Sequence, residues 1–495
     1  MLFSTYEFIF LFLPVTFFGY FYLNKKRLTT ASKAWLVVTS LFFYSWWNVA
    51  YLPLILVSML FNYVVGSSLS EGGHSKKRPP RKLMLIFGIS SNVALLAYFK
   101  YADFLIENLN YIPDVQVDAL NLALPLAISF FTFQQIAYLV DSYRLETKEY
   151  DFLNYAVFVS FFPQLIAGPI VHHKEMMPQF DNNRSKIINY QNVLMGLFIF
   201  SIGLFKKVVI ADSLAVWVSS GFDVATTLNF FEAWAVSLSY TFQLYFDFSG
   251  YVDMAIGLGL LFNIKLPINF NSPYKATNIQ DFWRRWHMTL SRFLRDYVYI
   301  PLGGNRVGPF RVYFNLLATF VIGGIWHGAG WTFIFWGFLH GMALVIQRVW
   351  SFLNIKMWAW VSWFITFNFV NIAWVFFRAE NWSDAMKVLK GMFDLRGIVF
   401  PDRYNFMQVL PDKYLGAMSD FSPNIKADET LIFWLFGSAI AALFFKNSVE
   451  MIKYPILLSS SRITFIKLAA YSIILLTGLA AISLQSYTEF IYFNF

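Results

Sequence analysis

The sequence contains no cysteine and few charged side chains. Only 14% of its 495 residues are Asp, Glu, Lys or Arg, against roughly 25% in an average soluble domain. The lack of cysteine excludes disulfides, thiolate nucleophiles and cysteine-ligated metals. HExxH motifs and histidine pairs four residues apart are also missing, so we expect neither a metal nor a permanently bound cofactor. Oxygen and imidazole groups must carry any chemistry.

Hydrophobic and aromatic residues are abundant instead. They make up 58% and 21% of the chain, a composition typical of lipid-facing surfaces and interfacial aromatic belts. It excludes the soluble, disordered and fibrous classes. The net charge of +9 is concentrated in short loops, so we expect the lipid bilayer and not nucleic acid as the surrounding partner. No polar block is long enough for a separate domain. We predict one membrane domain over residues 1–495, with a catalytic core at about 160–345 and an external loop at about 378–429.

Apolar segments of about 17 to 25 residues are long enough to cross a bilayer as helices. The sequence therefore predicts an all-α polytopic membrane protein with eleven to thirteen transmembrane helices. We place them near residues 5–23, 33–49, 52–69, 83–100, 121–141, 152–168, 190–218, 230–262, 312–326, 329–350, 357–377, 430–446 and 464–485.

The distribution of Lys and Arg predicts the orientation. Basic clusters follow the first and third predicted spans, at 25–27 and 76–82. The positive-inside rule makes both loops cytoplasmic and places the N-terminus outside. Because the apolar run continues to about Leu23 without a small-residue cleavage site, we expect a retained first span and not a signal peptide.

Glycine and proline interrupt several of the helical stretches in the second third of the chain. They include Gly168-Pro169, Pro267, Pro273 and the run Pro301–Asn305. Non-helical backbone at membrane depth is tolerated only where protein or a water-filled cavity satisfies it. We therefore expect re-entrant or broken helices around a central channel. No internal repeat is visible, which weakens a transporter interpretation.

The six histidines have different surroundings. His74 lies in a basic loop and is expected to be solvated, whereas His172 and His173 follow the break at Gly168-Pro169. His327 lies between glycines and tryptophans in an apolar span. Burying a polar ring there is costly, so such a residue is a functional candidate. For His340 on the next span we favour a hydrogen bond to a neighbouring helix.

The sequence predicts one amphipathic helix for the basic segment at residues 281–297. Helical spacing places Trp283, Trp286 and His287 on one face, and Arg284, Arg285, Arg292 and Arg295 on the other. The arginines can extend to lipid headgroups, or they can also bind an anionic substrate such as the phosphates of coenzyme A. Two carboxylates within spans, Asp247 and Asp253, should each face a partner or a cavity.

Several long motifs in order resemble the membrane-bound O-acyltransferases, and within them the bacterial branch typified by the alginate O-acetylation membrane protein. The motifs are Phe162-Pro-Gln-Leu-Ile-Ala-Gly-Pro169, Gln243-Leu-Tyr-Phe-Asp-Phe-Ser-Gly-Tyr251, Phe282-Trp-Arg-Arg-Trp-His287, Tyr299-Ile-Pro-Leu-Gly-Gly-Asn-Arg306, Gly324-Ile-Trp-His-Gly328 and Val375-Phe-Phe-Arg-Ala-Glu380. The family's catalytic histidine falls on His327, and the polar residue of its second motif falls on His287.

The resemblance implies an O-acetyltransferase subunit in the bacterial inner membrane. Acetyl-coenzyme A would be the donor on the cytoplasmic side, with Arg284, Arg285, Trp283 and Trp286 as candidate donor-binding residues. His327 would accept the proton of the attacking hydroxyl, while His287 would orient His327, bind donor or stabilise charge. A periplasmic partner with a serine nucleophile is implied, because residues 378–429 lack a nucleophile-elbow motif.

The acceptor implied is an exported polysaccharide, alginate first, with peptidoglycan and cellulose as further possibilities. Two alternatives stay open. One is a transporter or export channel for the polysaccharide or an acylated intermediate, with the histidines as a proton relay. The other is a scaffold for a polymer-secretion complex, in which the buried histidines are dispensable.

Overall fold

The computed structural model describes residues 1–70, 80–147, 151–395, 424–425, 429–452, 461–484 and 490–491. Every regular element in these ranges is helical, which confirms the all-α prediction. His74 and most of the predicted external loop at 378–429 lie outside the described residues. The helices belong to two compact units, and α11 (Phe230–Leu261) contributes to both.

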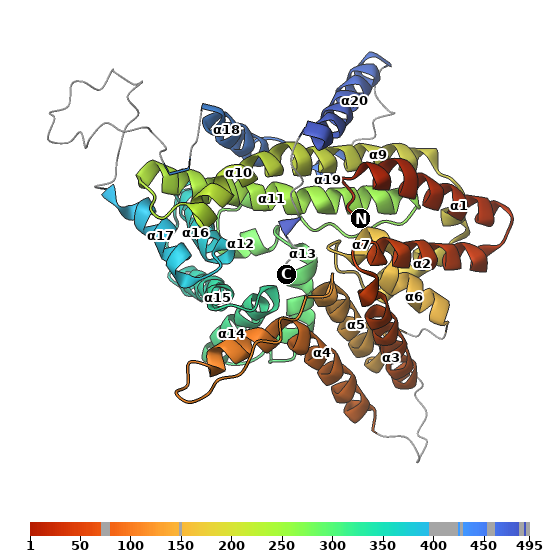
Figure 1. The fold of residues 1–495 in the computed structure, drawn as a ribbon, viewed down its shortest axis with the longest axis horizontal. Helices are drawn as coiled ribbons and strands as arrows, with labels where there is room; N and C mark the ends of the chain where they lie inside the picture. The colour runs from red at the N-terminus through yellow and green to blue at the C-terminus, as the bar shows by residue number, and fades with distance from the viewer. Residues whose placement is uncertain are drawn as a thin grey trace. The chain divides into compact units, whose positions relative to one another are not determined.

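Unit 1 comprises residues 1–204, 250–269 and 452–495. Its helices are α1 (Leu13–Lys25), α2 (Thr29–Ser45), α3 (Leu52–Ser70), α4 (Arg81–Leu109), α5 (Ile128–Tyr143), α6 (Phe152–Ser160), α7 (Phe162–Leu165), α8 (His173–Asp181), α9 (Tyr190–Leu204) and α20 (Ser461–Leu484) (Figure 1).

Unit 2 comprises residues 205–249 and 270–451. Its helices are α10 (Asp212–Ser219), α12 (Ile279–Trp283), α13 (Met288–Leu294), α14 (Pro309–His327), α15 (Trp331–Phe352), α16 (Ala359–Arg378), α17 (Trp382–Phe393), α18 (Glu429–Leu443) and α19 (Ser448–Ile452). Short 3₁₀ and π-helical segments connect them, among them the π-helices η4 (Phe205–Ala211) and η7 (Arg295–Tyr299).

Eight helices of the described residues are long and apolar enough to span a membrane, fewer than the eleven to thirteen predicted. Two of the other predicted spans, near 33–49 and 121–141, contain helices of only 17 and 16 residues. The predicted span at 152–168 is divided between α6, which ends at Ser160, and α7, which begins at Phe162 with Pro163 in its first turn. Near 430–446 the helix α18 has only 15 residues, whereas the predicted span at 464–485 lies almost entirely within α20, which has 24 residues.

The helix breaks predicted at glycine and proline are confirmed. The chain leaves helical geometry around Gly168-Pro169, between the end of α11 and α12, and at Pro301–Asn305. Gly303 and Gly304 adopt φ values of +112° and +54°, which glycine reaches without steric cost. These breaks turn the chain between helices, so that short segments such as α12 and α13 pack beside long ones.

Polar side chains inside the helical layers satisfy one another. In unit 1, Asn62 on α3 and Asn92 on α4 exchange amide hydrogen bonds of 2.7 and 3.0 Å. Ser58 donates to the side-chain oxygen of Gln135 on α5 at 2.8 Å. In unit 2, Asn371 on α16 accepts from Thr241 on α11 at 2.6 Å. Hydrogen bonds of this kind join helices in a medium that offers no water.

Candidate acyl-transfer site

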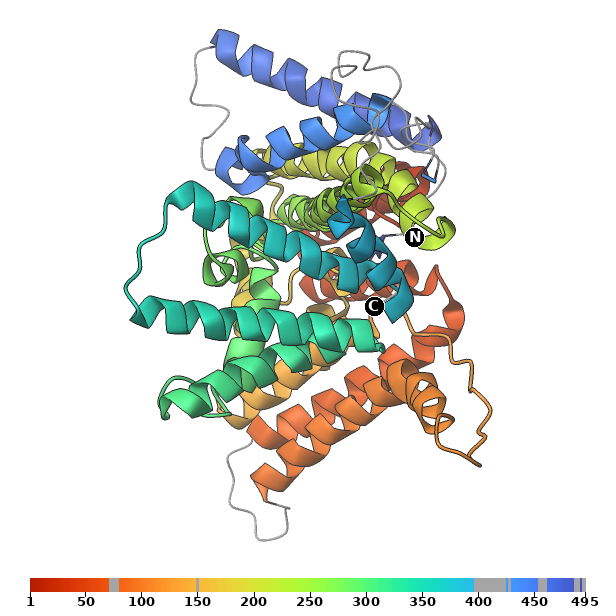
Figure 2. The same ribbon diagram turned by 90° about the vertical axis from the view of Figure 1, so that its left-hand side faces the viewer.

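The two long helices that carry His327 and His340 pack closely in unit 2. α14 and α15 lie side by side in both views (Figures 1 and 2). Glycines allow the approach: a Cβ atom on Gly324 would lie 2.4 Å from the carbonyl oxygen of Phe333, and one on Gly337 would lie 2.4 Å from that of Phe320. His327 follows Gly324 by three residues and His340 follows Gly337 by three. The glycine contact therefore sets the separation of the helix segments that bear both imidazoles.

His327 is the last residue of α14 and is buried, with 3% of its surface exposed. Aromatic rings enclose it. The centroids of Trp326, Phe377 and Trp336 lie 4.8, 5.0 and 5.1 Å from that of the imidazole, each at a steep interplanar angle. Phe377 comes from α16, whose end is anchored near α15 by a hydrogen bond from Thr332 to the carbonyl of Ala379. The prediction that His327 lies buried in apolar surroundings is confirmed.

His287 is also fully buried, between α12 and α13. Its backbone is left-handed, with φ of +42°, a conformation that few non-glycine residues adopt. The imidazole packs edge-on against Phe248, with ring centroids 4.8 Å apart, and its centroid lies 6.4 Å from that of Trp326. Trp326 is therefore a common neighbour of His287 and His327 in the same unit.

Burial controls the protonation of His287, which lies outside the eight candidate spans. Removal from water lowers the pKa of its imidazole to about 3, because a buried positive charge loses its solvation. The ring is therefore neutral at physiological pH. A neutral imidazole has one N–H donor and one acceptor nitrogen, so His287 can act through hydrogen bonds but not through a positive charge.

The prediction of one continuous amphipathic helix at 281–297 is wrong. α12 ends at Trp283, a turn follows, and α13 begins at Met288. The left-handed backbone of His287 breaks the helix and redirects the chain, which periodicity could not reveal. The predicted separation of the two faces nevertheless holds in part: Trp283 and Trp286 are buried, whereas Arg284 is exposed and Arg285 is half-buried.

The two adjacent arginines differ in their contacts. Arg285 binds the carboxylate of Asp281 at 3.0 Å and contacts the carbonyl of Asn271 at 3.5 Å. The guanidinium of Arg284 makes no hydrogen bond or ion pair with the described part of the chain. Next to them in the sequence, Trp286 lies against Trp374 with centroids 4.9 Å apart, and Trp283 lies against His340. The two arginines therefore adjoin buried, packed aromatic residues in the chain.

Unit 2 also contains a cluster of charged side chains away from the surface. The sequence pointed to Asp247 in this cluster but not to its partner Lys207 or to Asp212. Asp247 on α11 is 1% exposed and forms an ion pair with Lys207 of η4 at 2.9 Å. The same ammonium binds Asp212 at 2.6 Å. The predicted partner for Asp247 is thus confirmed and is a lysine 40 residues earlier. Asp253 is buried as well, in the part of α11 that belongs to unit 1.

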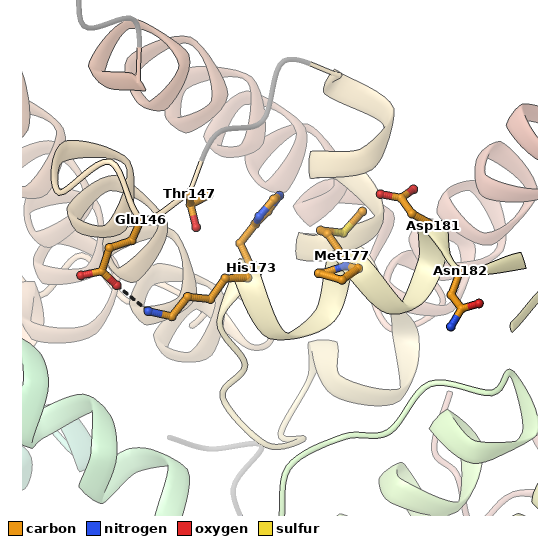
Figure 3. A pocket seen from close by; sticks show the side chains of 8 residues that line it. Glu146, Thr147, His173, Met177, Asp181 and Asn182 are labelled. Atoms are coloured by element: carbon orange, nitrogen blue, oxygen red, sulfur yellow. Dashed lines mark hydrogen bonds and ion pairs between the residues drawn. The ribbon is translucent and has the colours of Figure 1, made fainter. Parts of the chain in front are cut away.

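The remaining described histidines lie in unit 1, where His172 contacts the carboxylate of Asp141 at 3.3 Å. His173, at the start of α8, lines a cavity of about 710 Å³ together with Glu146, Thr147, Lys174, Met177, Pro178, Asp181 and Asn182. Figure 3 shows Glu146 on one side of it and Asp181 with Asn182 on the other. None of the residues predicted as catalytic lines this cavity.

Sequence reasoning missed the aromatic residues that enclose His327. Trp336 lies four residues before His340 on α15, so helical spacing could have placed it on the histidine-bearing face. Phe377 and Trp374 come from α16, about 50 residues after His327, and no local pattern links them to it.

The helices around His327 lie in a part of the chain that matches a known protein family. The family description of the membrane-bound O-acyltransferases matches residues 2–381. The chain belongs to this family. It is therefore a multi-pass membrane acyltransferase, and the resemblance seen in its motifs is confirmed. The match includes α12 to α16, the helices that surround His327.

Three relatives show the range of the family. The chain is 50% identical to the peptidoglycan O-acetyltransferase of Helicobacter pylori, over 100% of this chain and 98% of that protein. It is 42% identical to a probable alginate O-acetylase of Pseudomonas putida, over 79% of this chain and 80% of the relative. A teichoic acid D-alanyltransferase of Bacillus subtilis is 28% identical over 52% of this chain and 70% of its own length. These relatives are named for transfer to cell-envelope or secreted polymers.

Proposed function

We propose that this acyltransferase passes acetyl groups from cytoplasmic acetyl-coenzyme A across the bacterial inner membrane for O-acetylation of an exported polysaccharide. The observation that carries the proposal is the burial of His327 among Trp326, Trp336 and Phe377 within the part of the chain that matches the family. A neutral imidazole in dry surroundings is suited to accept a proton from a hydroxyl held against it.

The reaction transfers an acetyl group from the sulfur of coenzyme A to the oxygen of an acceptor hydroxyl. The oxygen of the acceptor hydroxyl attacks the thioester carbonyl, the C–O bond forms and the C–S bond breaks. His327 takes the hydroxyl proton and returns it to the leaving thiolate, so the products are an acetyl ester and free coenzyme A. We assign the hydroxyl to the serine of a periplasmic partner, which then acetylates the polymer. His287, as a neutral ring beside Trp326, would orient the histidine.

We assign the donor phosphates to Arg284 and Arg285. The buried Trp283 and Trp286 would support the two arginines from inside the protein without contacting the donor. Arg284 is exposed, and a guanidinium pairs well with phosphate. For the polymer we place peptidoglycan ahead of alginate, because the peptidoglycan-modifying relative is similar over the entire chain and the alginate relative over 79% of it.

The test is the content of ester-linked acetate in each purified envelope and secreted polysaccharide. Cells would carry the intact protein, His327→Ala or the control His173→Asn, at matched membrane levels. The control removes a buried imidazole from unit 1, where no proposed catalytic residue lies. Loss of acetate from one polymer in His327→Ala alone supports the proposal and names the acceptor. Unchanged acetate on every polymer contradicts it, and transport assays would then be the next measurement.

A further inference from the structure

The ring of His340 is held by a hydrogen bond inside unit 2. The indole N–H of Trp283 on α12 donates to Nδ1 of His340 on α15 at 3.2 Å. His340 is fully buried and Trp283 is 7% exposed. A ring nitrogen that accepts a hydrogen bond carries no proton, so the proton of this neutral imidazole is on Nε2. The bond fixes both the tautomer and the ring plane of His340.

Trp336 links this ring to His327. It lies one helical turn before His340 on α15. Its centroid is 4.8 Å from that of His340 and 5.1 Å from that of His327, where the two planes meet at 87°. It also stacks on Trp374 at 5.7 Å and 17°. Because the indole packs against both imidazoles, a rotation of its ring would move a direct neighbour of His327.

The polar atoms of this cluster argue against a role in packing alone. Nε2 of His340 and Nε1 of Trp336 are buried and have no hydrogen-bond partner among the described residues. Each unpaired buried donor costs free energy. Leucine or phenylalanine would fill comparable space without that cost. What the imidazole provides is an acceptor for Trp283 and a flat ring fixed against Trp336.

We propose that Trp283, His340 and Trp336 are positioning residues that hold the imidazole of His327 in its reactive orientation. The inference rests on the proposed function and deepens it, because it names residues that act through His327 without touching substrate. Displacements of about 1 Å from a reactive geometry can lower a rate by about 100-fold. A change at Trp283 should therefore reach His327 through two packed rings.

The experiment measures initial rates of [¹⁴C]acetyl transfer from acetyl-coenzyme A in membrane vesicles that contain the full-length protein and its acceptors. Trp283→Phe removes the indole N–H together with one of the two fused rings, a truncation that the control Trp363→Phe repeats elsewhere, and His340→Leu removes the acceptor. His340→Asn keeps an amide oxygen that can accept from Trp283. Trp363→Phe is the matched control, since it removes an indole hydrogen bond of 2.9 Å to the carbonyl of Tyr274. Rates are normalised to the amount of protein in the membrane.

We expect turnover per molecule to fall about tenfold or more in Trp283→Phe and His340→Leu, at an unchanged KM for acetyl-coenzyme A. His340→Asn should recover most of the loss, and Trp363→Phe should match the unaltered protein. The inference is overturned by normal turnover in Trp283→Phe and His340→Leu, by a rise in KM alone, or by a loss confined to protein amount. His327→Ala separates the two proposals: if it keeps normal turnover the proposed function fails, and if it is inactive while Trp283→Phe is normal, only the positioning role fails.

Discussion

Gly324 and Gly337 face each other where α14 packs on α15, and a Cβ atom on either residue would lie 3.2 Å from the other's Cα. Three residues beyond them lie His327 and His340. Because each added Cβ would also lie 2.4 Å from a carbonyl oxygen, neither glycine has room for a side chain unless the helices separate. The distance between α14 and α15 near the proposed catalytic residues therefore depends on the absence of a side chain at both positions.

Gly337→Ala is expected to destabilise the protein by about 1–3 kcal/mol, because backbone atoms must shift to admit the methyl group. The melting temperature and the membrane abundance of the full-length protein measure the effect. Gly437→Ala is the control, since a Cβ on Gly437 in α18 would meet nothing within 4 Å and alanine favours a helix. Equal melting temperatures and membrane abundances of the two variants would show that stability does not require the close packing at Gly337.

Lys207→Met should destabilise the protein by about 3–5 kcal/mol, because it removes the ammonium group that pairs with the buried carboxylate of Asp247 and with the partly buried carboxylate of Asp212. Lys174→Met removes the half-exposed pair with Glu146 and should cost less than about 1 kcal/mol. Thermal unfolding in detergent compares the two. Double replacement by Lys207→Met with Asp247→Asn should recover part of the loss, and an absence of recovery would argue against the ion pair as its origin.

His287 should make the protein less stable in acid. Its folded pKa of about 3 lies below the usual value of 6.5, so between these values the unfolded chain binds the proton and the folded chain does not. Its contribution is fully present above pH 6.5 and is lost as the pH falls toward 3, by about 2 kcal/mol between pH 6.5 and 5. His287→Asn, which tolerates a left-handed backbone, should flatten this part of the pH dependence of the melting temperature. An unchanged slope would contradict the assignment.

Arg284→Ala should raise the KM for acetyl-coenzyme A about three- to tenfold, with little change in turnover, if Arg284 binds a donor phosphate. The difference should shrink at high salt, because exposed charges are screened. Arg311→Ala, which removes an exposed arginine over Phe314 at the start of α14, is the control. A KM that is the same for both variants would exclude Arg284 from the donor site.

Local sequence determined the class of this protein and several of its features. Long apolar runs with few charges predict membrane helices, and the helical stretches of this chain are interrupted at Gly168-Pro169 and Pro301–Asn305. The glycines and tryptophans that flank His327 within an apolar segment were enough to identify it as a functional candidate. The same local reasoning failed at 281–297, where the left-handed backbone of His287 divides what periodicity presents as one helix.

Only the tertiary structure decided what surrounds these residues. Periodicity tells which face of a helix is buried, but it carries no information on the helix that covers that face. Phe377 reaches His327 from α16, and Trp283 reaches His340 across 57 positions of sequence. Lys207 likewise forms an ion pair with Asp247, which lies on another helix. Gly324 and Gly337 show the same limit, because only the packing of α14 on α15 brings these two glycines into contact.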